Sequence, residues 1–308
     1  MNDTTTLPAA DAGELRSTIN ASVREVALLA DVTIAVWSGE RTDASIMEEA
    51  KRNAGATGNV GRAIKNLMAG ADTRLKECRS AFSAMRQTHY SLTLPYVSDP
   101  NAQRLRGPRL LPNALFMPYL DTMGAKRRAA NAALDAFCAG YDEDKAAAQA
   151  NLGTLADDHY PTVEQVRGLF RAEFEFFPIP AGADFVNLPD AILKRLSSTL
   201  ADRQAAALTS AMRGMWETAR ERVEHLAAVM ADPEKTFKES TVEQAHDLAK
   251  LLPGWAIDGD PRAHEAAADI HGMLDGVTAK LIRKDGAVRA EIADRARALV
   301  VKLNEWGV

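Results

Sequence analysis

The stretch LKRLSSTLADRQAAALTSAMRGMWETARERVEHLAAVM, residues 193–230, carries a long helical pattern in this 308-residue chain. Its apolar side chains recur mostly at steps of three and four residues, which places them on one face of a helix. These side chains are Leu193, Leu196, Leu200, Leu208, Met212, Trp216, Ala219, Val223, Leu226 and Met230. The pattern predicts a helix of about 40 residues, or about 60 Å. A helix of that length favours a bundle with a projecting arm or packing against other subunits.

Two similar stripes lie upstream, on either side of a long loop. One runs from Val60 to Met85 with nearly heptad spacing, and the other runs from Leu115 to Tyr141. We expect the two stripes to form an antiparallel helical hairpin around residues 88–112. The loop alternates apolar and polar residues and is too apolar for disorder, so it predicts a β-hairpin or extended tip. Such a tip could cap the helix ends or bind a partner.

Shorter patterns complete the chain. The expected elements are a helix over Asp11–Ala30, a short strand in VTIAVWSG (32–39), a helix over Thr42–Asn53 capped by Thr42 or Asp43, and C-terminal helices over Thr241–Leu252, Pro261–Arg283 and Ala287–Trp306. The predicted fold is mainly α: an elongated helical bundle with a long antiparallel, coiled-coil-like hairpin arm and a small β element. We expect an N-terminal helix and strand in 1–59, the hairpin arm in 60–152 and a C-terminal bundle in 153–308.

The stretch FRAEFEFFPIPAGADF, residues 170–185, interrupts the helical patterns and holds five of the nine Phe in the chain. Its alternation followed by two Pro predicts an edge strand that ends at Pro178. We expect this strand to pair with VTIAVW and to wedge its rings beneath the long helices. The residues expected to form this structural pivot are Phe174, Phe176, Phe177, Pro178, Pro180 and Phe185.

Composition is that of a soluble chain, with 26% charged and 46% hydrophobic residues. The N-terminus lacks the basic and apolar regions of a signal peptide, and no apolar run is long enough to span a membrane. Cys78 and Cys138 are too few for a disulfide framework and fall inside helical patterns. These observations predict a cytosolic protein without membrane contact.

No motif predicts a catalytic residue, a metal site or a cofactor. GATGNVG (55–61) lacks the Gly-Lys-Ser/Thr of a phosphate-binding loop and is better interpreted as a connector. His264 and His271 share a helical face near Asp260 and Glu265, so they could bind a divalent metal or be solvated side chains. Adjacent acids such as Asp142 to Asp144 point in different directions on a helix. The sequence thus argues weakly against an enzyme.

A basic sector is the functional signal of most substance. Residues 51–128 hold 14 Lys and Arg against four Asp and Glu, a balance of +10 in a chain of net charge −5. The candidate interaction or nucleic-acid patch comprises Arg104, Arg106, Arg109, Lys126, Arg127 and Arg128. These cations could bind phosphates in a salt-sensitive way, or they could meet an acidic protein surface.

Three segments together carry a resemblance. LTLPY (92–96) with GPRLLP (107–112), then HYPTVEQVRGLFRAEFEFFPIPAGADF (159–185), then MRGMWETARERVEHL (212–226) resemble a family of uncharacterised bacteriophage proteins. They are more distantly similar to a bacterial domain of unknown function encoded near MoxR-type AAA+ ATPases. The resemblance implies a phage protein made in the host bacterial cytoplasm that could work with an AAA+ ATPase. It implies no catalytic residues.

Three functions are compatible with these patterns. The first is a non-enzymatic phage protein that acts by protein–protein interaction, as a homo-oligomer or with a partner such as an AAA+ ATPase. The second is a nucleic-acid-binding accessory protein that uses the basic sector. The third is a virion or scaffold component.

Overall fold

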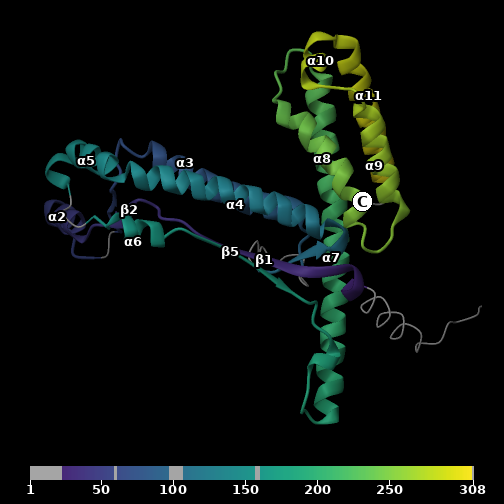
Figure 1. Cartoon of the computed structure of the whole chain (residues 1–308), viewed down its shortest axis with the longest axis horizontal. Coiled ribbons are helices and arrows are strands. Elements are labelled where there is room, and N and C mark those ends of the chain that lie inside the picture. The colour runs from purple at the N-terminus through teal and green to yellow at the C-terminus, as the bar shows by residue number, and fades with distance from the viewer. Residues whose placement is uncertain (1–22, 59–60, 97–106, 157–159, 307–308) are drawn as a thin grey trace, which may run out of the picture. The chain divides into compact units, whose positions relative to one another are not determined.

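The computed structural model describes residues 23–58, 61–96, 107–156 and 160–306. The fold is mainly α with a small antiparallel sheet, as predicted (Figure 1). The chain divides into two compact units. The described parts of Met1–Asp31, Ser91–Pro118 and Glu175–Val308 form one, which we call the bundle unit. Val32–Tyr90 and Tyr119–Phe174 form the other, the hairpin unit. Each unit therefore combines separate segments, whereas the patterns suggested three consecutive ones.

The hairpin unit is organised by helices α3 (Thr73–Leu92) and α4 (Phe116–Ala139). Arg74, near the start of α3, donates a hydrogen bond to the carbonyl of Gly140, just beyond the end of α4. At the other end, His89 Nδ1 lies 2.9 Å from the hydroxyl of Tyr119. Opposite ends of the two helices therefore meet, which confirms the predicted antiparallel hairpin.

The predicted stripes form the core of this unit. Leu75, Cys78, Phe82 and Met85 on α3 are buried, as are Met123, Ala130, Leu134 and Phe137 on α4. Upstream of Thr73 the helical prediction is wrong, because Ile64–Asn66 forms strand β3, which pairs with β2 (Glu40–Thr42). Ile64 is 64% exposed and takes no part in a helical seam. Val60 lies outside the described residues.

Three shorter helices complete the hairpin unit: α2 (Ala44–Ala54), α5 (Tyr141–Leu152) and α6 (Val163–Gly168). Asp43 caps α2, as predicted, by accepting hydrogen bonds from the backbone N–H groups of Ser45 and Ile46. A hydrogen bond from Lys65 and the bonds to the helix N-terminus hold the pKa of Asp43 well below its usual range.

The small sheet has the strand order β4 (Arg109–Pro112), β1 (Ala27–Ala35) and β5 (Arg171–Phe177). β5 is thus an edge strand next to β1, which confirms the predicted pairing of the Phe-rich stretch. β1 pairs antiparallel to β4, with Ala27 opposite Pro112 and Ala30 opposite Arg109. The predicted helix over 11–30 is therefore wrong from Ala27 onward. Residues 23–26 are helical, and residues 11–22 lie outside the described part of the chain.

The bundle unit contains α7 (Asp190–Ala231), α8 (Glu239–Trp255), α9 (Pro261–Leu274), α10 (Ala279–Lys284) and α11 (Gly286–Glu305). α7 has 42 residues and packs against α8 and α11, so the predicted long helix is confirmed. The single helix predicted over 261–283 is wrong, because the chain breaks at Gly276, whose φ of +66° is left-handed.

A buried arginine holds the C-terminal end of α7. Arg289 on α11 is 9% exposed and donates hydrogen bonds to five backbone carbonyls at and beyond the end of α7. These carbonyls belong to Val229, Met230, Asp232, Pro233 and Lys235. The guanidinium also lies 5.5 Å from the ring centre of Phe237. Because the last four carbonyls of a helix have no partner within the helix, Arg289 acts as a C-terminal cap.

Within the described residues, no helix combines the length and the apolar content that crossing a membrane requires.

Candidate interaction surface

The structure describes four of the six predicted basic residues and places them in different surroundings. Arg104 and Arg106 lie outside the described residues. Arg109 belongs to β4 in the bundle unit, where its Nε donates to Thr93 Oγ1 at 2.7 Å and its Nη2 to the Thr93 carbonyl at 2.8 Å. The side chain is half-buried, so Arg109 ties strand β4 to Thr93, which follows α3 and belongs to the same unit. This contact is structural.

The other three basic residues lie on α4 in the hairpin unit. Lys126, Arg127 and Arg128 are all exposed, and the Arg127 guanidinium lies 5.9 Å from the ring centre of Phe174. Because neighbouring residues on a helix are about 100° apart, three consecutive cations point in three directions and do not form one stripe.

The predicted pivot residues are less buried than expected. Phe174 is half-buried, whereas Phe176 and Phe177 are 36% and 41% exposed. Phe176 meets Phe116 edge-on at 5.3 Å between ring centres. Pro178 and Pro180 are exposed and Phe185 is half-buried, while the buried side chains in the stretch 170–185 are Phe170 and Ile179. The expected wedge of rings beneath the long helices is therefore corrected, because most of these rings stay in contact with solvent.

Residues 178–189 fold back along the first part of α7 and form a segment that we call the strap. The Gln204 side chain on α7 donates a hydrogen bond to the Pro180 carbonyl. Gly182 packs so closely on α7 that an added Cβ would lie 2.7 Å from Ser197 Oγ. Pro189 then leads directly into the helix. The strap thus runs antiparallel to α7 and covers one side of it, at the lower end of the helix in Figure 1.

Exposed apolar side chains concentrate at the strap and its two ends. Of 14 large hydrophobic side chains that are exposed among the described residues, five lie in residues 176–192. They are Phe176, Phe177, Val186, Leu188 and Ile192, with exposed fractions of 36%, 41%, 69%, 39% and 48%. We call residues 176–192 the apolar segment. Exposed apolar side chains that gather in one place mark interaction surfaces, whereas scattered ones are ordinary.

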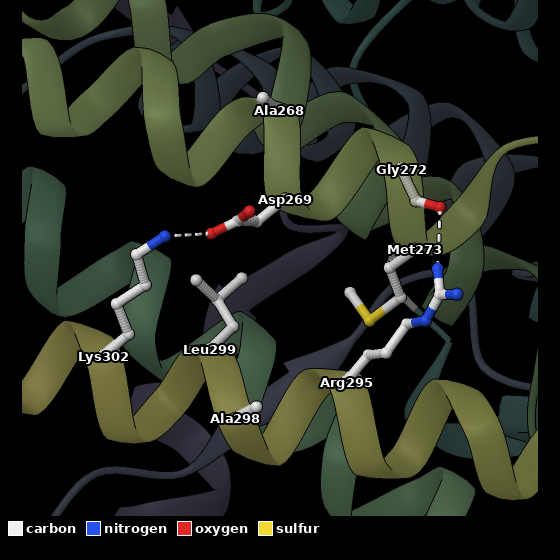
Figure 2. Close-up of a pocket in the computed structure, with 8 residues that line it drawn as sticks. All are labelled: Ala268, Asp269, Gly272, Met273, Arg295, Ala298, Leu299 and Lys302. Carbon is white, nitrogen blue, oxygen red and sulfur yellow. Dashed lines mark hydrogen bonds and ion pairs between the residues drawn. The ribbon is translucent and has the colours of Figure 1, made fainter.

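A second surface feature is a groove of about 360 Å³ between α9 and α11 (Figure 2). Asp269 and Lys302 form an ion pair of 2.6 Å at one end, and Arg295 donates to the Gly272 carbonyl at 3.2 Å at the other. Apolar side chains line the space between them: Ala268, Met273, Ala298 and Leu299. The charged groups pair across the groove, and its lining contains no nucleophile or histidine. We therefore interpret this groove as part of the packing contact between α9 and α11, whose polar groups pair with each other.

Candidate catalytic and metal-binding groups are not assembled in the described part of the chain. No set of three or more His, Cys, Asp or Glu side chains there is placed to hold a metal ion. His264 and His271 are exposed on α9, while Asp260 binds Arg262 and Glu265 pairs with Lys302. Both thiols are buried, and burial raises the pKa of Cys78 to about 12 and also raises that of Cys138. Such thiols are poor nucleophiles.

The described residues define a mainly α-helical protein with an exposed apolar segment beside its longest helix. Comparisons of the chain with protein-family models, with curated proteins and with solved structures found no match.

The sequence patterns did not single out the end of the apolar segment. Phe185 is the last residue of the Phe-rich stretch, and the long helical stripe begins at Leu193. The signal lay in between, because Val186, Leu188 and Ile192 continue an apolar series through residues that carry no helical stripe. Only the path of the strap shows that these side chains lie beside the first part of α7.

Replacing Phe176 with Asp is expected to give a soluble, folded protein. The ring is 36% exposed, so the carboxylate stays within reach of water, but the substitution also removes the covered part of the ring and its contact with Phe116. Circular dichroism should show the helix content of the wild type, with a melting temperature lowered by about 5–10 °C. Loss of soluble expression would instead indicate that the ring is an essential part of a core.

Proposed function

We propose that this chain is a non-enzymatic protein that acts through protein–protein contact, and that the apolar segment forms the contact surface. The observation that supports this proposal is the gathering of five exposed large hydrophobic side chains within residues 176–192. Covering such side chains is worth about 25 cal/mol per Å² of apolar surface, so a partner that covers all five gains substantial affinity.

The first partner that we propose is a second copy of the chain. The buried side chains of α7 begin at Gln204, so its first 14 residues, 190–203, contribute none. A helix in a protein is stabilised mainly by packing of its apolar face. Ile192 is 48% exposed and Leu196, one turn later, is half-buried, so these two side chains remain for a partner. Two-fold dimers are the commonest closed assemblies, and we expect one here.

The wider setting of this proposal rests on the resemblance of residues 92–96, 107–112, 159–185 and 212–226 to uncharacterised bacteriophage proteins. From this resemblance we propose the host bacterial cytoplasm as the location and an AAA+ ATPase as the second partner. A virion or scaffold component would use the same apolar segment for contact. Mass spectrometry of purified particles separates these two roles, because a virion protein is retained in the particles and a scaffold protein is absent from them.

Replacing Ile192 and Val186 with Asp is expected to convert the oligomer to a monomer. Two carboxylates in the proposed contact would lose their water without gaining a partner, which costs several kcal/mol. Light scattering coupled to size-exclusion chromatography measures the change. Val301→Asp is the matched control, because Val301 is 56% exposed on α11 and lies outside the apolar segment. A wild-type chain that is monomeric at high concentration would contradict self-association.

Nucleic-acid binding is the second candidate function, and it rests on the exposure of Lys126, Arg127 and Arg128 on α4, although these cations do not form one stripe. Phosphate contacts of this kind weaken steeply with salt. Binding of DNA or RNA at 50 mM salt that is lost at 200 mM would support this function. Absence of binding at 50 mM would reject it.

A further inference from the structure

A cationic groove lies in the hairpin unit, between α3 and the end of β1. Its volume is about 520 Å³, within the range of ligand sites. It is lined by Ile34, Val36, Lys76, Arg79, Ser80, Ser83 and Arg86. The five α3 residues are spaced by three, one, three and three positions, which puts them on one face of the helix. All five are exposed.

The two arginines are held by backbone carbonyls of residues 34–38, at and just beyond the end of β1, which we call the β1 segment. Arg79 Nη1 donates to the Ser38 carbonyl at 3.2 Å, and Arg86 Nη2 donates to the Ile34 carbonyl at 3.0 Å. β4 pairs with β1 only over Ala27–Ala30, so both carbonyls lie beyond that ladder. A guanidinium has five N–H donors. Within the described residues each arginine uses one of them in a hydrogen bond, and the others remain for a ligand.

The lining is positive and contains no carboxylate. Lys76 pairs with Asp72 at 2.9 Å, but the lysine is 70% exposed, and an exposed pair of this kind contributes little. Ser80 and Ser83 add two hydroxyl groups, and Ile34 and Val36 add an aliphatic wall. The groove therefore combines three cations, two of them arginines tied to the backbone of residues 34–38, with hydroxyl groups and apolar surface.

We propose that this groove binds an acidic, extended segment of a partner protein, an inference that rests on the proposed role in protein–protein contact. Arginine binds carboxylates through paired N–H groups. The two guanidiniums are anchored at carbonyls four residues apart, Ile34 near the end of β1 and Ser38 beyond it, which lie at most about 13 Å apart along the chain. Carboxylates at every fourth position of an extended peptide reach over the same span. Aliphatic side chains of such a peptide match Ile34 and Val36.

The lining favours a peptide over single-stranded nucleic acid. Sites for single strands stack bases on aromatic rings, and the groove lining contains no aromatic side chain. The aliphatic wall offers nothing to a base but suits Val or Leu.

The test uses the full chain and a fluorescein-labelled peptide with Glu at every fourth position and Val and Thr between. Fluorescence anisotropy is expected to show binding that weakens at least about tenfold in Arg79→Ala/Arg86→Ala, as for the loss of charge-assisted hydrogen bonds. The same peptide with Gln in place of Glu is expected to bind at least about tenfold more weakly. Equal affinity for the Glu and Gln peptides would overturn the proposal, and so would tighter binding of an oligothymidine of similar length.

A second variant separates binding from folding, because Arg79 and Arg86 also contact the strand. Lys76→Ala/Ser80→Ala/Ser83→Ala removes groove groups that, among the described hydrogen bonds, do not hold β1, and it is expected to weaken peptide binding about three- to tenfold, with unchanged circular dichroism. Lys126→Ala, an exposed cation outside the groove, is the control and is expected to bind normally. Unchanged binding in the triple variant would reject the groove.

The Ile192→Asp/Val186→Asp variant distinguishes this proposal from the previous one. It is expected to bind the acidic peptide with wild-type affinity while losing self-association. A chain that self-associates but does not bind the peptide rejects the groove alone. A chain that binds the peptide but stays monomeric rejects self-contact by the apolar segment alone.

Discussion

Replacing Arg289 with Met is expected to lower the free energy of unfolding of the bundle unit by about 3–5 kcal/mol. The substitution keeps most of the side-chain volume but removes the donors for five carbonyls at the end of α7. Each buried carbonyl left without a partner costs about 1–3 kcal/mol, and water recovers part of this loss at the rim. Few single side chains in the described structure hold as many backbone groups.

Urea denaturation followed by tryptophan fluorescence measures this effect, because Trp216, Trp255 and Trp306 all belong to the bundle unit. Arg297→Ala is the matched control on the same helix. Arg297 is exposed and, within the part of the chain that the structure describes, pairs only with Asp294 one turn away, so its loss is expected to change stability by less than about 0.5 kcal/mol. If Arg289→Met were as stable as this control, the carbonyl contacts would contribute nothing to stability.

Replacing Phe137 with Ala is expected to destabilise the hairpin unit by about 3–5 kcal/mol. The ring is fully buried and stands at the centre of an aromatic cluster. Its ring centre lies 6.2 Å from that of Trp37, 5.8 Å from that of Tyr141 and 6.3 Å from that of Phe170. Removal leaves a cavity whose aromatic walls cannot collapse without breaking several ring contacts.

Trp37 belongs to the hairpin unit, so the fluorescence of a variant that keeps Trp37 as its only tryptophan reports on this cluster. Leu120→Ala is the control from the same helix α4, since Leu120 is 36% exposed, and we expect less than half the effect. A Phe137→Ala protein with unchanged unfolding would show that the cluster does not stabilise the unit.

The long helices could be predicted because many apolar side chains recur with the same helical periodicity. Over α7 ten apolar positions share one face, and a single misread residue cannot change the result. The predicted stripe that began at Val60 failed in its first turns, where Ile64 and Leu67 happen to continue the phase of α3. There the pairing of β3 with β2 decides the structure, and that contact is invisible in a local pattern.

Strand β1 is a second case in which a local sequence pattern cannot show a long-range strand pairing. Residues 27–31, ALLAD, fit the end of a helical stripe as well as they fit a buried strand. Hydrogen bonds from β4, 80 residues later in the chain, select the strand. The break at Gly276 could have been predicted from the sequence, because Asp-Gly is a turn signal. Helix α9 ends immediately before this dipeptide.

Candidate sites were harder to predict than elements. Counting cations identified a basic sector but not which cations share a surface. Arg109 proved to be committed to Thr93, whereas Arg79 and Arg86 share a groove only because the β1 segment runs beside α3. Spacing along α3 could have suggested their common face; their anchoring carbonyls could not be predicted.

The division of the chain also sets an order of folding during synthesis. The hairpin unit is complete once residue 174 has left the ribosome, whereas the bundle unit needs α11 and the cap that Arg289 provides. Domains fold as units while the chain is made, at about 5–20 residues per second. The hairpin unit is therefore formed first, and Ser91–Pro118 must wait for the last 134 residues before its own unit can close. A ribosome stalled before residue 289 would carry a folded hairpin and an open bundle, with the apolar segment already outside the exit tunnel.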